Sequence, residues 1–142
     1  MDHIVYVDAG AKELELLLAG DKTMIIRGAS GRKMPYGRVD PGDVLYLINN
    51  NAEGMVRAKA QVESVFNSDK LSETASAALV ANRQDKLRLS PKQLERWSGK
   101  RYLVLIEVSQ VEEVSPFGID KSAYINMDDW LPVEKIDSVR LG

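Results

Sequence analysis

The sequence predicts an α+β protein built around a small, mostly antiparallel or mixed β-barrel with helices inserted between its strands. Two observations support this fold class. Several short segments typical of strands lie close together along the chain, and helix-forming segments interrupt them without a regular strand–helix–strand alternation. A chain of 142 residues, with 44% hydrophobic and 28% charged residues, fits a single globular domain over residues 1–142.

The first half of the chain contains strand patterns and one helix pattern. The expected helix, KELELLLA, carries strong helix formers and is followed by Gly20, a residue that commonly ends helices. The last strand pattern alternates apolar and polar residues and follows a turn rich in asparagine, so it predicts a hairpin with the strand before it. The strands are expected at residues 3–7, 23–26, 44–48 and 55–66, and the helix at residues 12–19.

The second half predicts two helices followed by a long strand. Residues 72–86 are rich in Ala, Glu, Gln and Arg. Ser90, Pro91 and Gln93 combine an N-cap, a proline at the first helical position and a capping-box glutamine. Trp97, near the end of this helix, is expected to anchor the core. We expect the helix to end at Gly99, a strand over residues 101–114, a turn at 116–118 and a last short strand within 136–141.

Composition excludes several classes of function. The absence of cysteine excludes disulfides, thiolate metal sites and a cysteine nucleophile. A formal net charge of −2 and a pI near 5.5 argue against strong non-specific binding to duplex nucleic acid. No apolar run approaches the roughly 20 residues that span a membrane, and the N-terminus lacks the pattern of a signal peptide. We therefore expect a cytoplasmic protein without a membrane partner.

Catalytic and metal-binding patterns are sparse. The single histidine, His3, lies at the edge of an apolar strand, where a structural role is more common than catalysis. Asp128 and Asp129 are adjacent, so in an extended segment they point in opposite directions and do not chelate together. No metal site and no cofactor are expected.

The segment from Lys22 to Arg38 is the strongest candidate for a binding site. It holds five basic residues and no acidic residue within an acidic chain, together with glycines that let a backbone approach a ligand. Tyr36 lies among these cations, and aromatic stacking beside cations is typical of nucleotide recognition. A solvated loop paired with nearby carboxylates remains the alternative. Arg57 and Lys59 could extend the patch, and Trp130, beside Asn126, could form a second wall or belong to the core.

One motif resembles a known family. Gly20, Lys22 and Arg27 match three positions of the G-x-K-x-x-E-x-R signature of the ASCH family, a branch of the PUA-like superfamily, whereas Ile25 replaces its glutamate. The helix before this motif, the turn at residues 39–44 and the strand VRAKAQVESV follow the same order as in that family.

The resemblance implies a small PUA-like barrel with a cleft lined by the motif's Lys and Arg, and binding of RNA or modified nucleosides. Some members hydrolyse an N-acyl group from a modified cytidine with a Lys, a Thr and a downstream Glu. Lys22 matches that lysine, but Ile25 stands at the threonine position and Thr23 lies two residues earlier. Glu63 or Glu73 could supply the acid.

The absence of a nucleophile at position 25 favours binding over catalysis. We expect an RNA- or modified-nucleotide-binding module, in which Lys22 and Arg27 point into a cleft beneath a mobile basic loop. The alternatives are a hydrolase of the same fold, either an N-acyl-cytidine amidohydrolase or a ribonuclease, and a binder of an acidic protein segment. The candidate nucleic-acid contacts are Lys22, Arg27, Arg32, Lys33, Tyr36, Arg38, Arg57 and Trp130, and the candidate catalytic residues are Lys22, Thr23 and Glu63.

Overall fold

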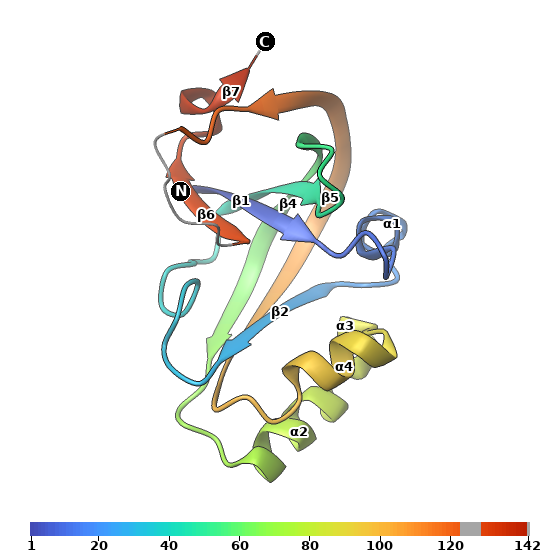
Figure 1. The fold of residues 1–142 in the computed structure, drawn as a ribbon, viewed down its shortest axis with the longest axis vertical. Coiled ribbons are helices and arrows are strands. Elements are labelled where there is room, and N and C mark those ends of the chain that lie inside the picture. Colours follow the sequence, from blue (N-terminus) through green and yellow to red (C-terminus); the bar gives the residue numbers. More distant parts are fainter. Residues whose placement is uncertain (123–128, 142) are drawn as a thin grey trace.

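The computed structural model describes residues 1–122 and 129–141, which form one strongly curled sheet with helices packed against its outside (Figure 1). The strands are β1 (Asp2–Val7), β2 (Met24–Ala29), β3 (Val44–Asn49), β4 (Met55–Asn67), β5 (Tyr102–Ile119), β6 (Trp130–Glu134) and β7 (Arg140–Leu141). The helices are α1 (Glu13–Ala19), α2 (Glu73–Asn82), α3 (Gln84–Leu87), α4 (Pro91–Trp97) and the 3-10 turn η1 (Ile136–Ser138).

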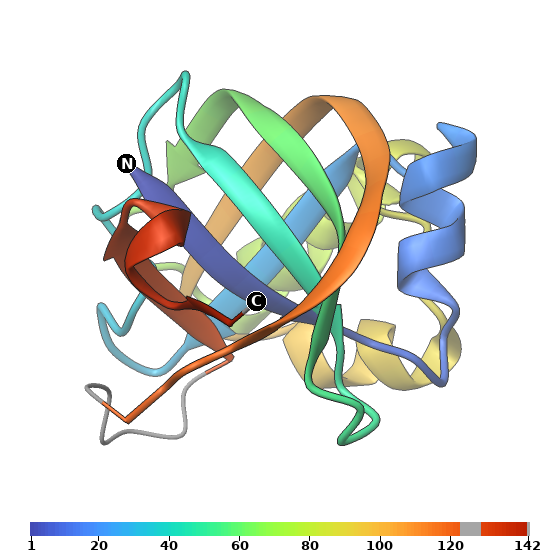
Figure 2. The ribbon, with the colours of Figure 1, turned by 90° about the horizontal axis from the view of Figure 1, so that it is seen from above.

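The sheet is a half-barrel. Its strand order is β2-β5-β4-β3-β1-β6, with β7 added to the far end of β5. Only β1 and β3 run parallel, and the other pairs among the described strands are antiparallel. Viewed along the curl, the strands surround a common interior (Figure 2). The edge strands β2 and β6 do not pair with one another in the described residues, so a seam separates β2 from the β1–β6 pair.

Three groups of apolar side chains hold the fold together. The largest fills the barrel and includes Val5, Leu17 and Ile25. A second closes the end of the barrel around Phe117 and Ile136. The third lies between β2 and helices α2–α4, where buried Met24 and Ile26 meet Val80, Leu87 and Trp97. Because alternate residues of a strand face opposite sides, β2 contributes to both the barrel and the helical layer.

Most predicted elements are confirmed. The strand patterns at residues 3–7, 44–48 and 55–66 correspond to β1, β3 and β4, and β3 and β4 form the expected hairpin. The expected α+β class with a mixed, barrel-like sheet is confirmed, and the sheet forms a half-barrel. Gly20 ends α1 with a φ of 78°, and its amide bonds to the last turn of the helix. In α4 the Ser90–Gln93 capping box forms in both directions. Trp97 is buried as expected.

Three boundaries differ from the sequence-based expectations. β2 continues to Ala29, beyond residue 26, because it pairs with β5 as far as Tyr102. The predicted helix over 72–86 breaks into α2 and α3 at Arg83. The turn expected at residues 116–118 is wrong, because β5 continues through it and Phe117 pairs with Val56.

Pro116 is accommodated within β5 by a break in register. The pairing of β4 with β5 shifts between Val56 and Ala58, which face Phe117 and Glu113 respectively. Pro116 therefore lies within a bulge, where its missing N–H removes no ladder hydrogen bond. No helix in the part of the chain that the structure describes is long and apolar enough to cross a membrane.

Candidate functional site

Arg27 bridges the open seam of the half-barrel. Its Nη2 donates to the Tyr6 carbonyl of β1 at 2.7 Å, and its Nη1 donates to the Ile26 carbonyl of β2 at 2.8 Å. Edge strands leave backbone groups without ladder partners, and a guanidinium can satisfy two carbonyls at once. Arg27 is only 7% exposed. The sequence suggested it as a ligand contact, but its main role in the structure is to link the two sides of the seam.

Two adjoining cavities open at this seam, and we call them together the seam cleft. They measure about 170 and 40 Å³. Four residues line both cavities: Arg27, Arg96, Trp97 and Asp129. The larger cavity is also lined by Gly28, Lys33, Met34 and Lys100, and the smaller one by Tyr6, Asp8, Glu13, Asn50 and Gln93.

Positive charge dominates the larger cavity. Arg27, Lys33, Arg96 and Lys100 line it, and Asp129 contributes the one lining carboxylate within residues 1–122 and 129–141. The guanidinium of Arg96 lies 4.3 Å from the ring centre of Trp97, and that of Arg27 lies 5.9 Å from the same ring. A guanidinium stacked on a ring keeps the N–H donors at its edge available, so the exposed Arg96 can use them to bind an anion.

The short helix α4 places these side chains at the seam. Ser90 Oγ accepts the Gln93 amide at 3.2 Å, and Gln93 Oε1 accepts the Ser90 amide at 3.0 Å, so the start of the helix is fixed. Buried Trp97 anchors its last turn in the helical layer. Arg96 and Lys100 flank that anchor and are exposed at the mouth of the cleft.

Lys22 lies in the interior of the protein, outside the exposed cationic surface. Its side chain is fully buried, its Nζ lies 3.3 Å from Glu13 Oε2, and it donates to the Leu87 carbonyl. Burial lowers the pKa of Lys22, and the nearby charge of Arg27 lowers it further, whereas Glu13 opposes this shift. Glu13 Oε1 in turn accepts the Asp8 amide at 2.8 Å.

The candidate catalytic residues do not meet in the seam cleft. Lys22 and Thr23 line a separate groove of about 430 Å³ between α1 and β5, together with Ser109. Glu63 is exposed on β4 and accepts a hydrogen bond from Ser109 Oγ. These three candidates therefore lie around another part of the surface, where Lys22 is already held by Glu13.

The basic loop is anchored, in contrast to the mobile lid that the sequence suggested. Tyr36 Oη donates to the Ser68 carbonyl at 2.6 Å, and the Gly37 amide donates to Asn67 Oδ1 at 2.9 Å. The Arg32 guanidinium stacks over Tyr36 at 5.5 Å and over Tyr102 at 5.6 Å. The loop thus forms a fixed rim beside the cleft, which it joins through Lys33 and Met34. Arg38 is exposed on the same loop.

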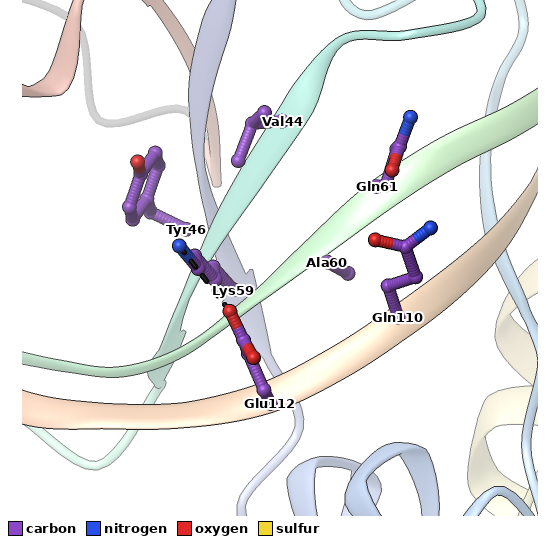
Figure 3. Close-up of a pocket in the computed structure, with 7 residues that line it drawn as sticks. All are labelled: Val44, Tyr46, Lys59, Ala60, Gln61, Gln110 and Glu112. Atoms are coloured by element: carbon purple, nitrogen blue, oxygen red, sulfur yellow. Dashed lines mark ion pairs between the residues drawn. The ribbon is translucent and has the colours of Figure 1, made fainter.

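Arg57 and Lys59 lie elsewhere. Arg57 pairs with Glu53 in its own hairpin and lines a groove beside α1. Lys59 pairs with Glu112 at 3.3 Å on the outer face of the barrel. Figure 3 shows Lys59 and Glu112 in a further hollow, with Tyr46, Gln61 and Gln110 around them. Neither cation extends the basic patch.

Trp130 belongs to the core, and its ring lies close to the guanidinium of Arg27. Its Nε1 donates to His3 Nδ1 at 3.1 Å, and His3 Nε2 therefore carries the proton donated to Asp43 Oδ2 at 2.8 Å. Burial would raise the pKa of Asp43, but hydrogen bonds from the Asp40 amide and from His3 outweigh it and lower that pKa. The buried Trp130 ring lies 5.6 Å from the Arg27 guanidinium. His3 is structural.

The sequence-based interpretation missed Arg96 and Lys100 and assigned Trp97 only to the core. The available signal was a capped helix whose end is followed by further basic residues, including Arg101. No group of three or more His, Cys, Asp or Glu side chains within residues 1–122 and 129–141 is arranged to hold a metal ion. Asn126 and Asp128 fall outside the described residues.

The fold matches that of ASCH proteins. Two point variants of the ASCH protein from Zymomonas mobilis superpose with a TM-score of 0.69 at 14% identity, covering 96% of this chain and 93% or 91% of theirs. Another structure of ASCH from Zymomonas mobilis gives 0.65 at 16% identity, covering 94% of this chain and 89% of that one. No family model and no curated protein matches the sequence. The chain therefore has the same fold as these ASCH proteins.

Proposed function

We propose that this protein binds single-stranded RNA or a modified nucleotide in the seam cleft. The observation that carries the proposal is the presence of Arg27, Lys33, Arg96 and Lys100 around one cavity beside Trp97, in a chain of net charge −2. Local cationic surfaces on acidic proteins attract anions to one place. Phosphate groups are anions that guanidinium and ammonium groups bind well.

The anchored loop supports a strand in preference to an isolated nucleotide. Lys33 lines the cleft, and its neighbour in the chain, Arg32, is stacked on Tyr36 and Tyr102. Exposed Arg38 continues the same rim. Cations interleaved with aromatic rings along a surface suit the alternating phosphates and bases of a single strand. A double helix would need a wider basic face than this one.

The two alternative functions receive less support from the same contacts. A hydrolase would require an accessible base, but the Lys22 side chain is fully buried and ion-paired with Glu13. An acidic protein segment would use the same cations, but it would gain nothing from the aromatic side chains along the rim. The stacked arrangement therefore favours a nucleic-acid ligand.

The binding test uses exposed residues, because Lys22 and Arg27 are buried and replacing them would disturb the fold. We expect Arg96→Ala with Lys100→Ala to weaken binding of a short single-stranded RNA roughly tenfold at low salt, because two phosphate contacts are lost. The slope of log K against log salt should become shallower by roughly 1.4. Fluorescence anisotropy of a labelled hexanucleotide over a salt series measures both quantities.

A matched control removes two cations from a different face. Arg57→Ala with Lys59→Ala changes the net charge equally but leaves the seam cleft intact. Its affinity should stay close to that of the wild type. Equal losses in the two double variants would mean that only net charge matters, and absence of wild-type binding at low salt would contradict the proposed function.

A further inference from the structure

Among the residues that the structure describes, Asp129 contributes the one carboxylate that lines the larger cavity of the seam cleft. Its backbone is fixed, because the Asp129 carbonyl accepts the Tyr6 amide at 2.9 Å and Trp130 begins β6 immediately afterwards. Its side chain is 42% exposed. The backbone of Asp129 is therefore tethered at the cleft, whereas its carboxylate is partly exposed to solvent.

The carboxylate lies between the two arginines that line both cavities. Asp129 Oδ2 is 3.3 Å from Arg27 Nε and 4.0 Å from Arg96 Nη2. A well-formed guanidinium–carboxylate pair has shorter contacts of about 2.7–2.9 Å. The pairing with Asp129 is correspondingly loose, and the exposed contact between Asp129 and Arg96 contributes little to stability.

Arg27 Nε has an unused hydrogen-bonding capacity. This atom is buried and makes no hydrogen bond to any described residue, although the other two guanidinium nitrogens donate to backbone carbonyls. A buried donor left without an acceptor is unfavourable, so it favours an anion that can approach more closely than Asp129 does. The cleft thus contains a donor that its own carboxylate does not satisfy.

We propose that Asp129 is a built-in competitor that occupies the anion position of the seam cleft and must rotate away when a phosphate group of the ligand binds. This inference rests on the proposed function. Because Asp129 is tethered beside both arginines, its effective local concentration is high although its contacts are weak. Asp129 thereby sets a minimum affinity for anions at this position. A ligand whose phosphate binds both arginines displaces Asp129, whereas a weakly bound anion does not.

The direct test is Asp129→Asn, which keeps the side-chain size and removes the charge. We expect the affinity for a 5′-phosphorylated hexauridylate to rise roughly fivefold or more at low salt, as expected for removing a like charge about 4 Å from the bound anion. The difference should shrink as salt increases. Asp129→Ser serves as a second variant, since it preserves the backbone bond to Tyr6 and also removes the carboxylate.

Asp137→Asn is the matched control, because exposed Asp137 lies in η1 at the other end of the barrel. It should bind as the wild type does. If the wild type binds and the Asp129 variants bind equally or more weakly, the competitor role is overturned while the proposed function stands. If neither wild type nor variants bind at low salt, both are overturned.

Discussion

At the scale of single residues, the cleft depends on charges that are buried and paired beneath its surface. Lys22 and Glu13 form an ion pair inside the protein, and the Asp8 amide also binds Glu13. Removing one partner of such a pair leaves the other charge uncompensated at low dielectric, which costs more than the pair itself contributes. We therefore expect Lys22 to contribute mainly to the stability of the fold.

We expect Glu13→Gln to lower the free energy of unfolding by about 3 kcal/mol at pH 7. Without Glu13, the pKa of Lys22 should fall further, because the group that raised it is gone. Between that lowered pKa and the ordinary value of 10.5 the unfolded chain binds more protons than the folded one, so the variant should regain stability as pH rises. Urea unfolding at several pH values measures this trend.

Exposed Glu15 lies on the same helix and provides the control. Glu15→Gln should change the free energy of unfolding by less than about 0.5 kcal/mol, with no recovery at alkaline pH. A small, pH-independent loss for Glu13→Gln would show that the pair is not important for stability.

At the scale of elements, α4 is the part that turns a gap between strands into a cleft. A helix of 7 residues has little stability of its own, so its position depends on its cap and on buried Trp97. The same element carries Arg96 on its exposed side, and Lys100 follows it. A short element fixed at both ends can present charged side chains without large motions.

Ser90→Ala should lower the free energy of unfolding by about 1 kcal/mol, since the Gln93 amide loses its acceptor and the capping box is broken. Thermal or urea unfolding gives the change directly. Ser64→Ala, at an exposed position of β4, is the control and should have a much smaller effect. Equal effects of the two substitutions would mean that the cap does not stabilise α4.

At the scale of the whole molecule, an incomplete barrel has its cleft where the sheet does not close. The pairs from β2 round to β6 use backbone ladders, whereas the seam is joined by the Arg27 side chain. A seam held by side chains opens at a lower free energy than a continuous ladder does. We therefore expect the seam, where the site lies, to open more readily than the β4–β5 ladder.

The substitution Arg27→Lys tests whether the seam opens more readily than the backbone ladders. Lysine keeps the charge but cannot satisfy the Tyr6 and Ile26 carbonyls in the same forked geometry, so we expect a loss of about 2 kcal/mol in stability. Hydrogen exchange should accelerate at the Tyr6 amide, which bonds across to Asp129, while amides in the β4–β5 ladder remain protected. Arg57→Lys is the control on an exposed hairpin. Uniform acceleration throughout the sheet would contradict a local role at the seam.

Most elements and the fold class could be predicted from the sequence, because they depend on short-range patterns. Alternation in β4, the start signals of α4 and the glycine after α1 each correspond to a physical preference of neighbouring residues. The motif around Lys22 also indicated the ASCH fold that the structural comparison shows. The predicted turn at Pro116 was wrong because a bulge in β5, a feature of pairing with a distant strand, accommodates the proline.

The set of charged residues that line one cavity could be seen only in the tertiary structure. Lys22 and Arg27 lie close together in the sequence. In the structure, the Lys22 side chain is fully buried and paired with Glu13, whereas Arg27 spans the seam to Tyr6. Arg96 and Lys100 are far along the chain and reach the same cavity because α4 packs against β2. Burial and convergence arise from contacts between residues distant in sequence, and local patterns do not encode such contacts.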